Sequence, residues 1–126
     1  MTKFARTLCA GLAVGGLALA AAAPTSATDL EFLTGQMLYA QCSAKPGEAD
    51  YAARSQQCAG YVLGVSDAEQ AAQGAGAAQR VCLPATATAP SLTSTVAAFL
   101  EAHPDKRPLA AQDLVIEALS TAYPCR

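Results

Sequence analysis

The residues with the most distinctive chemistry in this chain are its five cysteines. One lies in an apolar N-terminal run, and the other four are spread over the rest of the sequence: Cys42, Cys58, Cys82 and Cys125. An even number of cysteines in a short exported domain is typical of a disulfide framework. A zinc site is disfavoured because no two of the four form a C-x2-C pair and the one histidine is isolated. We therefore expect two disulfides and no metal.

The four cysteines allow three pairings, and the sequence alone does not choose among them. The expected helices give a preference. Cys42 ends one helix and Cys58 lies on the next, so a bond between them would close a helical hairpin across the Pro46-Gly47 turn. Cys82 precedes the last two helices and Cys125 follows them. We therefore predict the pairs Cys42–Cys58 and Cys82–Cys125.

Outside the cysteines, His103 and its neighbours Glu101 and Asp105 are the candidates for acid–base chemistry. Nucleophilic catalysis needs a base within reach of the nucleophile and a third group that orients the base. With the four thiols oxidised, no such set is recognisable, and His103 is placed to cap the C-terminal end of a helix. Gly74 and Gly76 do not follow a strand, so they form no phosphate-binding pattern. We expect no enzymatic activity and no cofactor.

Polar side chains gather around the glycines at 74 and 76 and are the candidate contacts for a partner protein: Gln70, Gln73, Gln79 and Arg80. Binding residues are often carried by loops that a rigid scaffold positions. A plain polar loop is the other interpretation of the same residues, and both remain open.

The elements that position these residues are predicted to be helices. Apolar residues recur at helical spacing in four segments, and no alternating β pattern is present. The first segment begins at Thr28 or Asp29 and ends near Ser43, with Thr34 a second possible cap because Gly35 weakens its first turn. The other three are expected from about Ala49 to Gln73, from a Ser91 cap to Pro104, and from Pro108 to Pro124. The fold class is therefore all-α, a compact domain of four or five helices with two disulfides.

Two glycines on the second helix suggest a close contact with another backbone. Gly60 and Gly64 lie one turn apart, on a helix whose expected apolar face comprises Cys58, Tyr61, Val62, Val65 and Ala68. Each glycine costs a helix up to about 1 kcal/mol relative to alanine, so a packing reason is expected. Packing within one subunit and a crossing between the subunits of a homodimer explain them equally well.

The N-terminus indicates export. Lys3 and Arg6 are followed by an apolar run over residues 8–23 and by small residues that fit a signal-peptidase site ending at Ala27. The run is short and rich in alanine and glycine for a membrane span. We therefore expect a cleaved signal peptide at residues 1–27 rather than an anchor, and a periplasmic protein without a membrane segment after cleavage. Cys9 would leave with the signal peptide.

The helical domain then comprises residues 28–126, about 99 residues with ten acidic and six basic side chains. Its net charge of −4 and its lack of a basic stripe disfavour a nucleic-acid partner, because phosphate binding needs several well-placed cations. A domain this small buries a modest fraction of its surface, so covalent cross-links have a clear purpose.

Four short motifs, in order, resemble those of the Rap/Tai family of immunity proteins associated with type VI secretion. Cys58-Ala-Gly-Tyr61-Val-Leu-Gly64 is similar to the family's C-x-G-Y-x-x-G helix start, and Val81-Cys82-Leu83-Pro84 to its C-x-P segment. Phe99-Leu100-Glu-Ala-His103-Pro104 resembles its [YF]-L-x-x-H-P helix end, and the stretch from Leu114 to Tyr123-Pro124-Cys125 resembles its A-L-x-x-x-[FY]-P-C ending. The resemblance covers roughly Gly35 to Cys125.

The resemblance implies a periplasmic, helical, disulfide-bonded homodimer that binds a peptidoglycan amidase injected by neighbouring cells. Such an amidase is a cysteine peptidase with a groove, and an inhibitor need only fill that groove. The alternative function is an orphan periplasmic protein of the same fold that acts as a stress chaperone or envelope adaptor, an analogy that rests on fold class alone.

Overall fold

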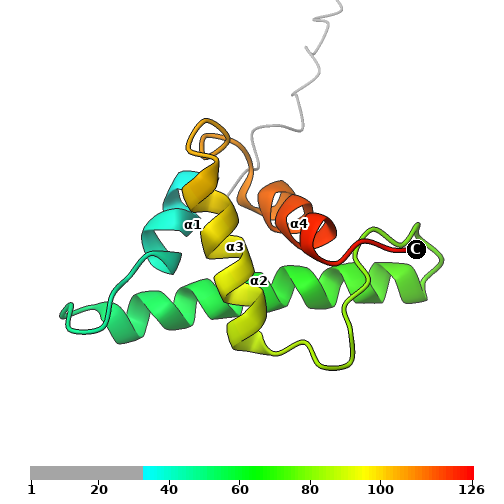
Figure 1. Ribbon diagram of the computed structural model, residues 1–126, viewed down its shortest axis with the longest axis horizontal. Coiled ribbons are helices and arrows are strands. Elements are labelled where there is room, and N and C mark those ends of the chain that lie inside the picture. The colour runs from blue at the N-terminus through cyan, green and yellow to red at the C-terminus, as the bar shows by residue number, and fades with distance from the viewer. Residues whose placement is uncertain (1–32) are drawn as a thin grey trace, which may run out of the picture.

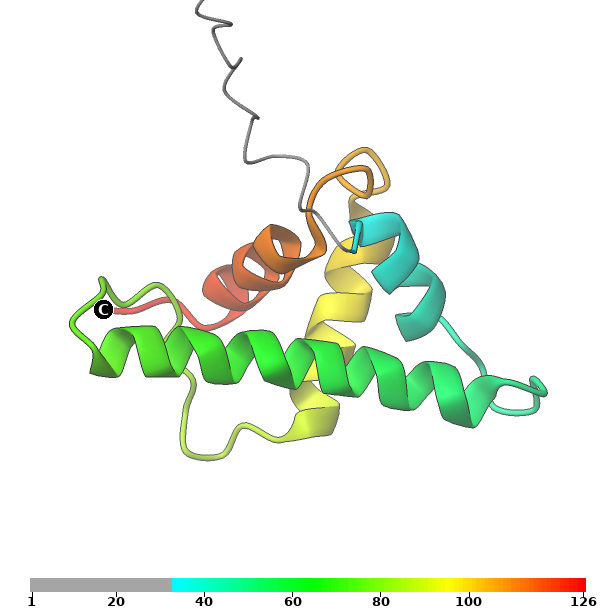
Figure 2. The ribbon, with the colours of Figure 1, turned by 180° about the vertical axis from the view of Figure 1, so that it is seen from behind.

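The longest of the described helices runs along one side of the domain, and the other three pack against it. The computed structural model describes residues 33–126. Helices α1 and α4 lie over the N-terminal and C-terminal halves of α2, and α3 crosses α2 between them (Figures 1 and 2). Every pair of helices is in contact. The helices are α1 (Gly35–Cys42), α2 (Tyr51–Gly74), α3 (Ala89–Ala102) and α4 (Ala111–Ala122).

The all-helical fold class is confirmed for the part of the chain that the structure describes. The one β-type interaction there is a single antiparallel bridge between Thr34 and Ala110. The core is formed by the inner faces of all four helices and by Val81 from the segment after α2. Its buried residues are Leu38, Cys58, Val62, Val81, Leu92, Val96, Leu100, Ala111, Leu114, Val115, Ile116, Ala118 and Leu119.

Both predicted disulfides are present. Cys42–Cys58 joins the end of α1 to α2 and closes a separation of 16 residues. Cys82–Cys125 joins the segment after α2 to the end of the chain and closes a separation of 43 residues. The pairing that was preferred on helical geometry is therefore confirmed.

Helix α1 begins at the second of the predicted caps. The Thr34 hydroxyl accepts a hydrogen bond from the Met37 amide at 3.3 Å, and the helix ends at Cys42, one residue before the predicted end. The caps at Thr28 and Asp29 lie outside the described residues. The start of α1 is tied to the loop before α4, because the Gly35 amide donates to the Leu109 carbonyl at 2.8 Å.

Two predicted helix starts are wrong. Helix α3 is capped by Thr88, three residues before the predicted Ser91, and Ser91 instead completes a capping box with Thr88. Pro90 is tolerated there because the first turn of a helix needs no amide donor. Helix α4 begins at Ala111 rather than at Pro108. The Arg107 and Leu109 carbonyls accept hydrogen bonds from the start of α1, which holds this stretch outside the helix.

The buried face of α2 also differs from the prediction. Cys58 and Val62 are buried as expected, but Ser66 and Glu69 continue the buried stripe, whereas Ala68 is exposed. The reason is the helical period of 3.6 residues, which turns Ala68 well away from Cys58 while returning Glu69 close to the same face.

The close backbone approach in this fold occurs at Gly35, not at the glycines of α2. A Cβ atom at Gly35 would lie 3.0 Å from the Arg107 carbonyl oxygen and 3.1 Å from its Cα, and would collide with the Leu114 side chain. At Gly60 and Gly64 a Cβ atom would have no neighbour within 4 Å. Packing within one subunit therefore does not account for the glycines of α2.

This contrast predicts opposite effects of one substitution. Gly35→Ala should lower the free energy of unfolding by about 1–3 kcal/mol, because it overpacks a junction whose neighbour includes backbone. Gly60→Ala, measured at a concentration where the protein is monomeric, should raise it by about 0.5–1 kcal/mol, because alanine favours the helix. Urea unfolding of both variants measures the two effects, and a neutral or stabilising Gly35→Ala would contradict the packing of α1 described here.

Candidate functional site

The predicted partner-binding residues lie at the C-terminal end of α2 and in the segment of residues 77–88 that follows it, which we call the return segment. The return segment leads from the end of α2 to the start of α3 (Figure 1). It is anchored to the C-terminal end of the chain by the Cys82–Cys125 disulfide and by a 2.9 Å hydrogen bond from the Cys82 amide to the Tyr123 carbonyl. Gln70 and Gln73 lie on α2, and Gln79 and Arg80 lie on the return segment.

Arg80 is held by a partner that was not predicted. Its guanidinium forms a two-point ion pair with Glu69, with Nε 3.0 Å from Oε2 and the second contact between Nη2 and Oε1. The Glu69 side chain is 11% exposed, whereas that of Arg80 is 54% exposed. The ion pair therefore clamps the return segment to α2 and compensates a carboxylate that faces the core. An acidic residue at an apolar-face position of α2 is the sequence signal that could have identified Glu69.

Gln73 has a similar anchoring role. Its side-chain amide donates to the Val81 carbonyl at 3.3 Å, and Val81 is buried in the core. Gln70 and Gln79 are exposed, and their side chains make no hydrogen bond within residues 33–126. The structure thus divides the four predicted residues into two that fix the return segment and two that face solvent.

The surface beside Gln70 is concave. An open groove of about 320 Å³ runs between α2 and residues 83–89, with Leu63, Leu83 and Leu92 among its apolar lining and Asp67 and Gln70 among its polar lining. A second cavity, which shares Ser66, Gln70 and Leu83 with the groove, has a volume of about 10 Å³ and is too small for a ligand. Of these two, the groove is the one large enough to admit part of another molecule.

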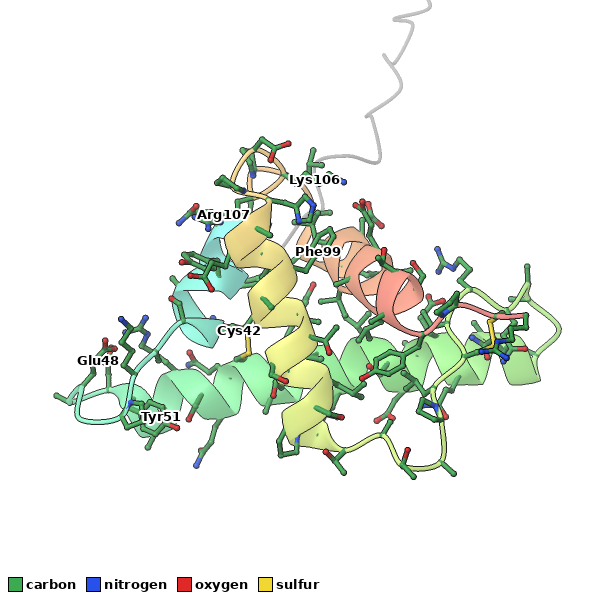
Figure 3. All side chains as sticks on the ribbon, viewed as in Figure 1. Cys42, Glu48, Tyr51, Phe99, Lys106 and Arg107 are labelled. Carbon is green, nitrogen blue, oxygen red and sulfur yellow. A yellow bond between two sulfur atoms is a disulfide. The ribbon has the colours of Figure 1, made fainter. Side chains whose placement is uncertain are left out.

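His103 has a structural role, as the sequence suggested. Its amide donates to the Phe99 carbonyl, its Nδ1 lies 2.8 Å from the same oxygen, and its ring stacks on that of Phe99 with centroids 4.2 Å apart. The Lys106 ammonium lies over the Phe99 ring, 5.6 Å from its centroid (Figure 3). Within the described part of the chain, no hydrogen bond or ion pair joins the His103 side chain to that of Glu101 or Asp105.

The described residues include no group of three or more His, Cys, Asp or Glu side chains able to hold a metal ion. None of the helices described is both long enough and apolar enough to cross a membrane.

The comparison with known proteins identifies a family to which the chain is similar. No curated protein and no solved structure gives a significant match. The family model of the Rap1a immunity proteins matches residues 34–125. This match begins at the cap of α1 and ends at Cys125, so it contains all four described helices and both disulfides. The chain belongs to the Rap1a immunity protein family, which implies immunity against a secreted effector, as an inhibitor rather than an enzyme.

Proposed function

We propose that this protein is a periplasmic immunity protein that binds a peptidoglycan amidase delivered by type VI secretion and occludes its active site. The observation that carries the proposal is the family match over the whole described helical domain. The four ordered motifs support the narrower assignment, because they are similar to those of Rap/Tai proteins that block amidases. A small cross-linked domain with a preformed binding surface suits an inhibitor, which needs shape rather than reactive groups.

The proposed compartment follows from the leader and the disulfides. We propose that residues 1–27 are a signal peptide cleaved after Ala27 and that the helical domain is released into the periplasm. Two disulfides persist in an oxidising compartment and not in a reducing cytosol. The periplasm is also where an injected amidase would meet peptidoglycan.

The proposed contact surface is the return segment and the adjoining turns of α2. The Cys82–Cys125 disulfide, the Glu69–Arg80 ion pair and the Gln73 hydrogen bond hold this surface in one conformation before binding. A preorganised surface loses less conformational entropy on association. Gln70 and Gln79 then contact the effector directly, while Gln73 and Arg80 act by positioning the segment.

The test is inhibition of an amidase by the purified, oxidised protein. Each amidase encoded near this gene would be co-expressed with the protein, purified through a tag on the amidase, and assayed for hydrolysis of peptidoglycan. We expect one amidase to retain the protein during purification and to lose its activity at a 1:1 ratio. If every such amidase stayed fully active and bound nothing, the proposed function would be wrong.

The contact surface is tested by charge insertion. With the amidase that co-purifies, Gln70→Arg and Gln79→Arg should each weaken binding by about tenfold or more, which corresponds to about 1.4 kcal/mol. Gln36→Arg is the matched control, because Gln36 is also an exposed glutamine but lies in the first turn of α1, outside the lining of the groove beside Gln70. If all three variants bound the amidase with the affinity of the wild-type protein, as measured by calorimetry, the contact surface would lie elsewhere.

We also propose a homodimer formed through α2. Gly60, Gly64 and Ala68 are exposed at successive turns and line an open depression of about 350 Å³ with Val65 and Gln112. Small residues at such spacing let two helices approach closely. Light scattering coupled to size exclusion should give twice the monomer mass, and Gly64→Trp should give the monomer mass. A wild-type monomer, or a Gly64→Trp dimer, would contradict this interface.

A further inference from the structure

A second, larger groove lies where α1, α2 and α3 meet. It has a volume of about 410 Å³, within the range of about 300–1,000 Å³ typical of ligand-binding clefts. The Cys42–Cys58 disulfide lies beside it, and Tyr51 at the start of α2 contributes to its wall (Figure 3). Small side chains dominate the remaining lining, which leaves room for an incoming chain: Ala44, Ser55, Thr93, Ser94, Ala97 and Ala98.

The serine and threonine hydroxyls in this groove are oriented as hydrogen-bond acceptors. Ser55 Oγ donates to the Ala52 carbonyl at 3.1 Å, Ser94 Oγ to the Ser91 carbonyl at 3.0 Å, and Thr93 Oγ1 to the Ala89 carbonyl at 3.0 Å. A hydroxyl has one hydrogen to donate, so each of these oxygens presents lone pairs to any further partner. The groove therefore favours an occupant that carries donors.

Glu101 adds a negative charge to the same groove. Its carboxylate has no partner in the described chain, whereas the other three described glutamates, Glu48, Glu69 and Glu117, are all ion-paired. It also lies in the last turn of α3, where a negative charge is unfavourable to the helix dipole. The Arg107 guanidinium, from the loop after α3, donates to the Leu100 and Glu101 carbonyls rather than to the Glu101 carboxylate.

We propose that this groove receives an arginine-bearing segment of the effector, with the arginine ion-paired to Glu101. Arginine has five N–H donors and no acceptor, which matches a lining of hydroxyl lone pairs and a carboxylate. It would also neutralise the one glutamate among residues 33–126 that has no ion-pair partner. This inference rests on the proposed function, because the segment belongs to the amidase, and it gives the protein a contact surface separate from the return segment.

The effector arm of the test uses Glu101→Gln, which keeps the side-chain shape and removes the charge. We expect about a tenfold loss of affinity for the amidase that co-purifies with the wild-type protein, with no fall in melting temperature. Asp113→Asn is the matched control, since it removes one charge from the first turn of α4, outside this groove, and should leave affinity unchanged. Equal affinities of the wild-type protein and Glu101→Gln would overturn the inference and leave the proposed function standing.

A second arm needs no effector. The peptide acetyl-Gly-Arg-Gly-amide, titrated into 15N-labelled protein, should shift the backbone amides of Ser55, Ser94 and Glu101, and acetyl-Gly-Gln-Gly-amide should not. Glu101→Gln should remove the shifts caused by the arginine peptide. Indistinguishable responses to the two peptides, or shifts that survive Glu101→Gln, would overturn the inference even if no amidase were found.

Discussion

Removing the Cys82–Cys125 disulfide should lower the free energy of unfolding by about 4 kcal/mol. In the chain-entropy model a cross-link stabilises by restricting the unfolded chain, and the effect grows with the length of the closed loop. The separation here is 43 residues, against 16 for Cys42–Cys58, for which the same model gives about 3 kcal/mol. For a domain of this size, either loss is a large part of a total stability of about 5–15 kcal/mol.

The measurement is urea unfolding of the Cys82→Ala/Cys125→Ala and Cys42→Ala/Cys58→Ala variants under non-reducing conditions, followed by circular dichroism. Hydrogen exchange adds a local readout. In the first variant the amide of residue 82 and its neighbours in the return segment should lose protection, because the disulfide and the hydrogen bond to Tyr123 hold the same two segments of the chain together. A Cys82→Ala/Cys125→Ala variant as stable as the wild type would contradict the constraint assigned to this disulfide.

The helices and the disulfide pairing could be predicted from sequence because the signals for both are local. Pro104 and Pro124 mark the ends of α3 and α4. Cys42 and Cys58 lie on either side of the turn between the first two helices, and Cys82 and Cys125 flank the last two, which favours one pairing. The start of α4 could not be predicted in the same way. Pro108 suits a first helical turn, but the Arg107 and Leu109 carbonyls bond to residues more than 70 positions earlier, at the start of α1. Nothing in the local sequence specifies that pairing.

The exposure of the candidate partner-binding residues was predictable in part, but their contacts within the fold were not. A polar cluster beside a glycine-rich turn marks a loop surface, and the structure places Gln70 and Gln79 there in solvent. The anchoring roles of Gln73 and Arg80 depend on where the return segment lies against α2, which is a tertiary property. The groove at Glu101 was also not predictable, because its lining comes from three helices and no single segment contains its pattern.

Leu38→Ala should lower the free energy of unfolding by about 2–5 kcal/mol, the range for truncating a fully buried leucine. Leu38 is 0% exposed and is the one large side chain of α1 that is buried; Gly35, the other buried residue, contributes no side chain. The packing of this helix therefore depends on Leu38, on the partly buried Tyr39, on the close approach at Gly35 and on the Cys42–Cys58 disulfide.

Met37→Ala is the control for Leu38→Ala, because Met37 is the preceding residue of the same helix but is 51% exposed. It should change stability by no more than about 0.5 kcal/mol, as is usual for surface positions. Thermal and urea unfolding of the oxidised variants would compare the two. If Leu38→Ala had as small an effect as Met37→Ala, the packing role assigned to Leu38 would be wrong.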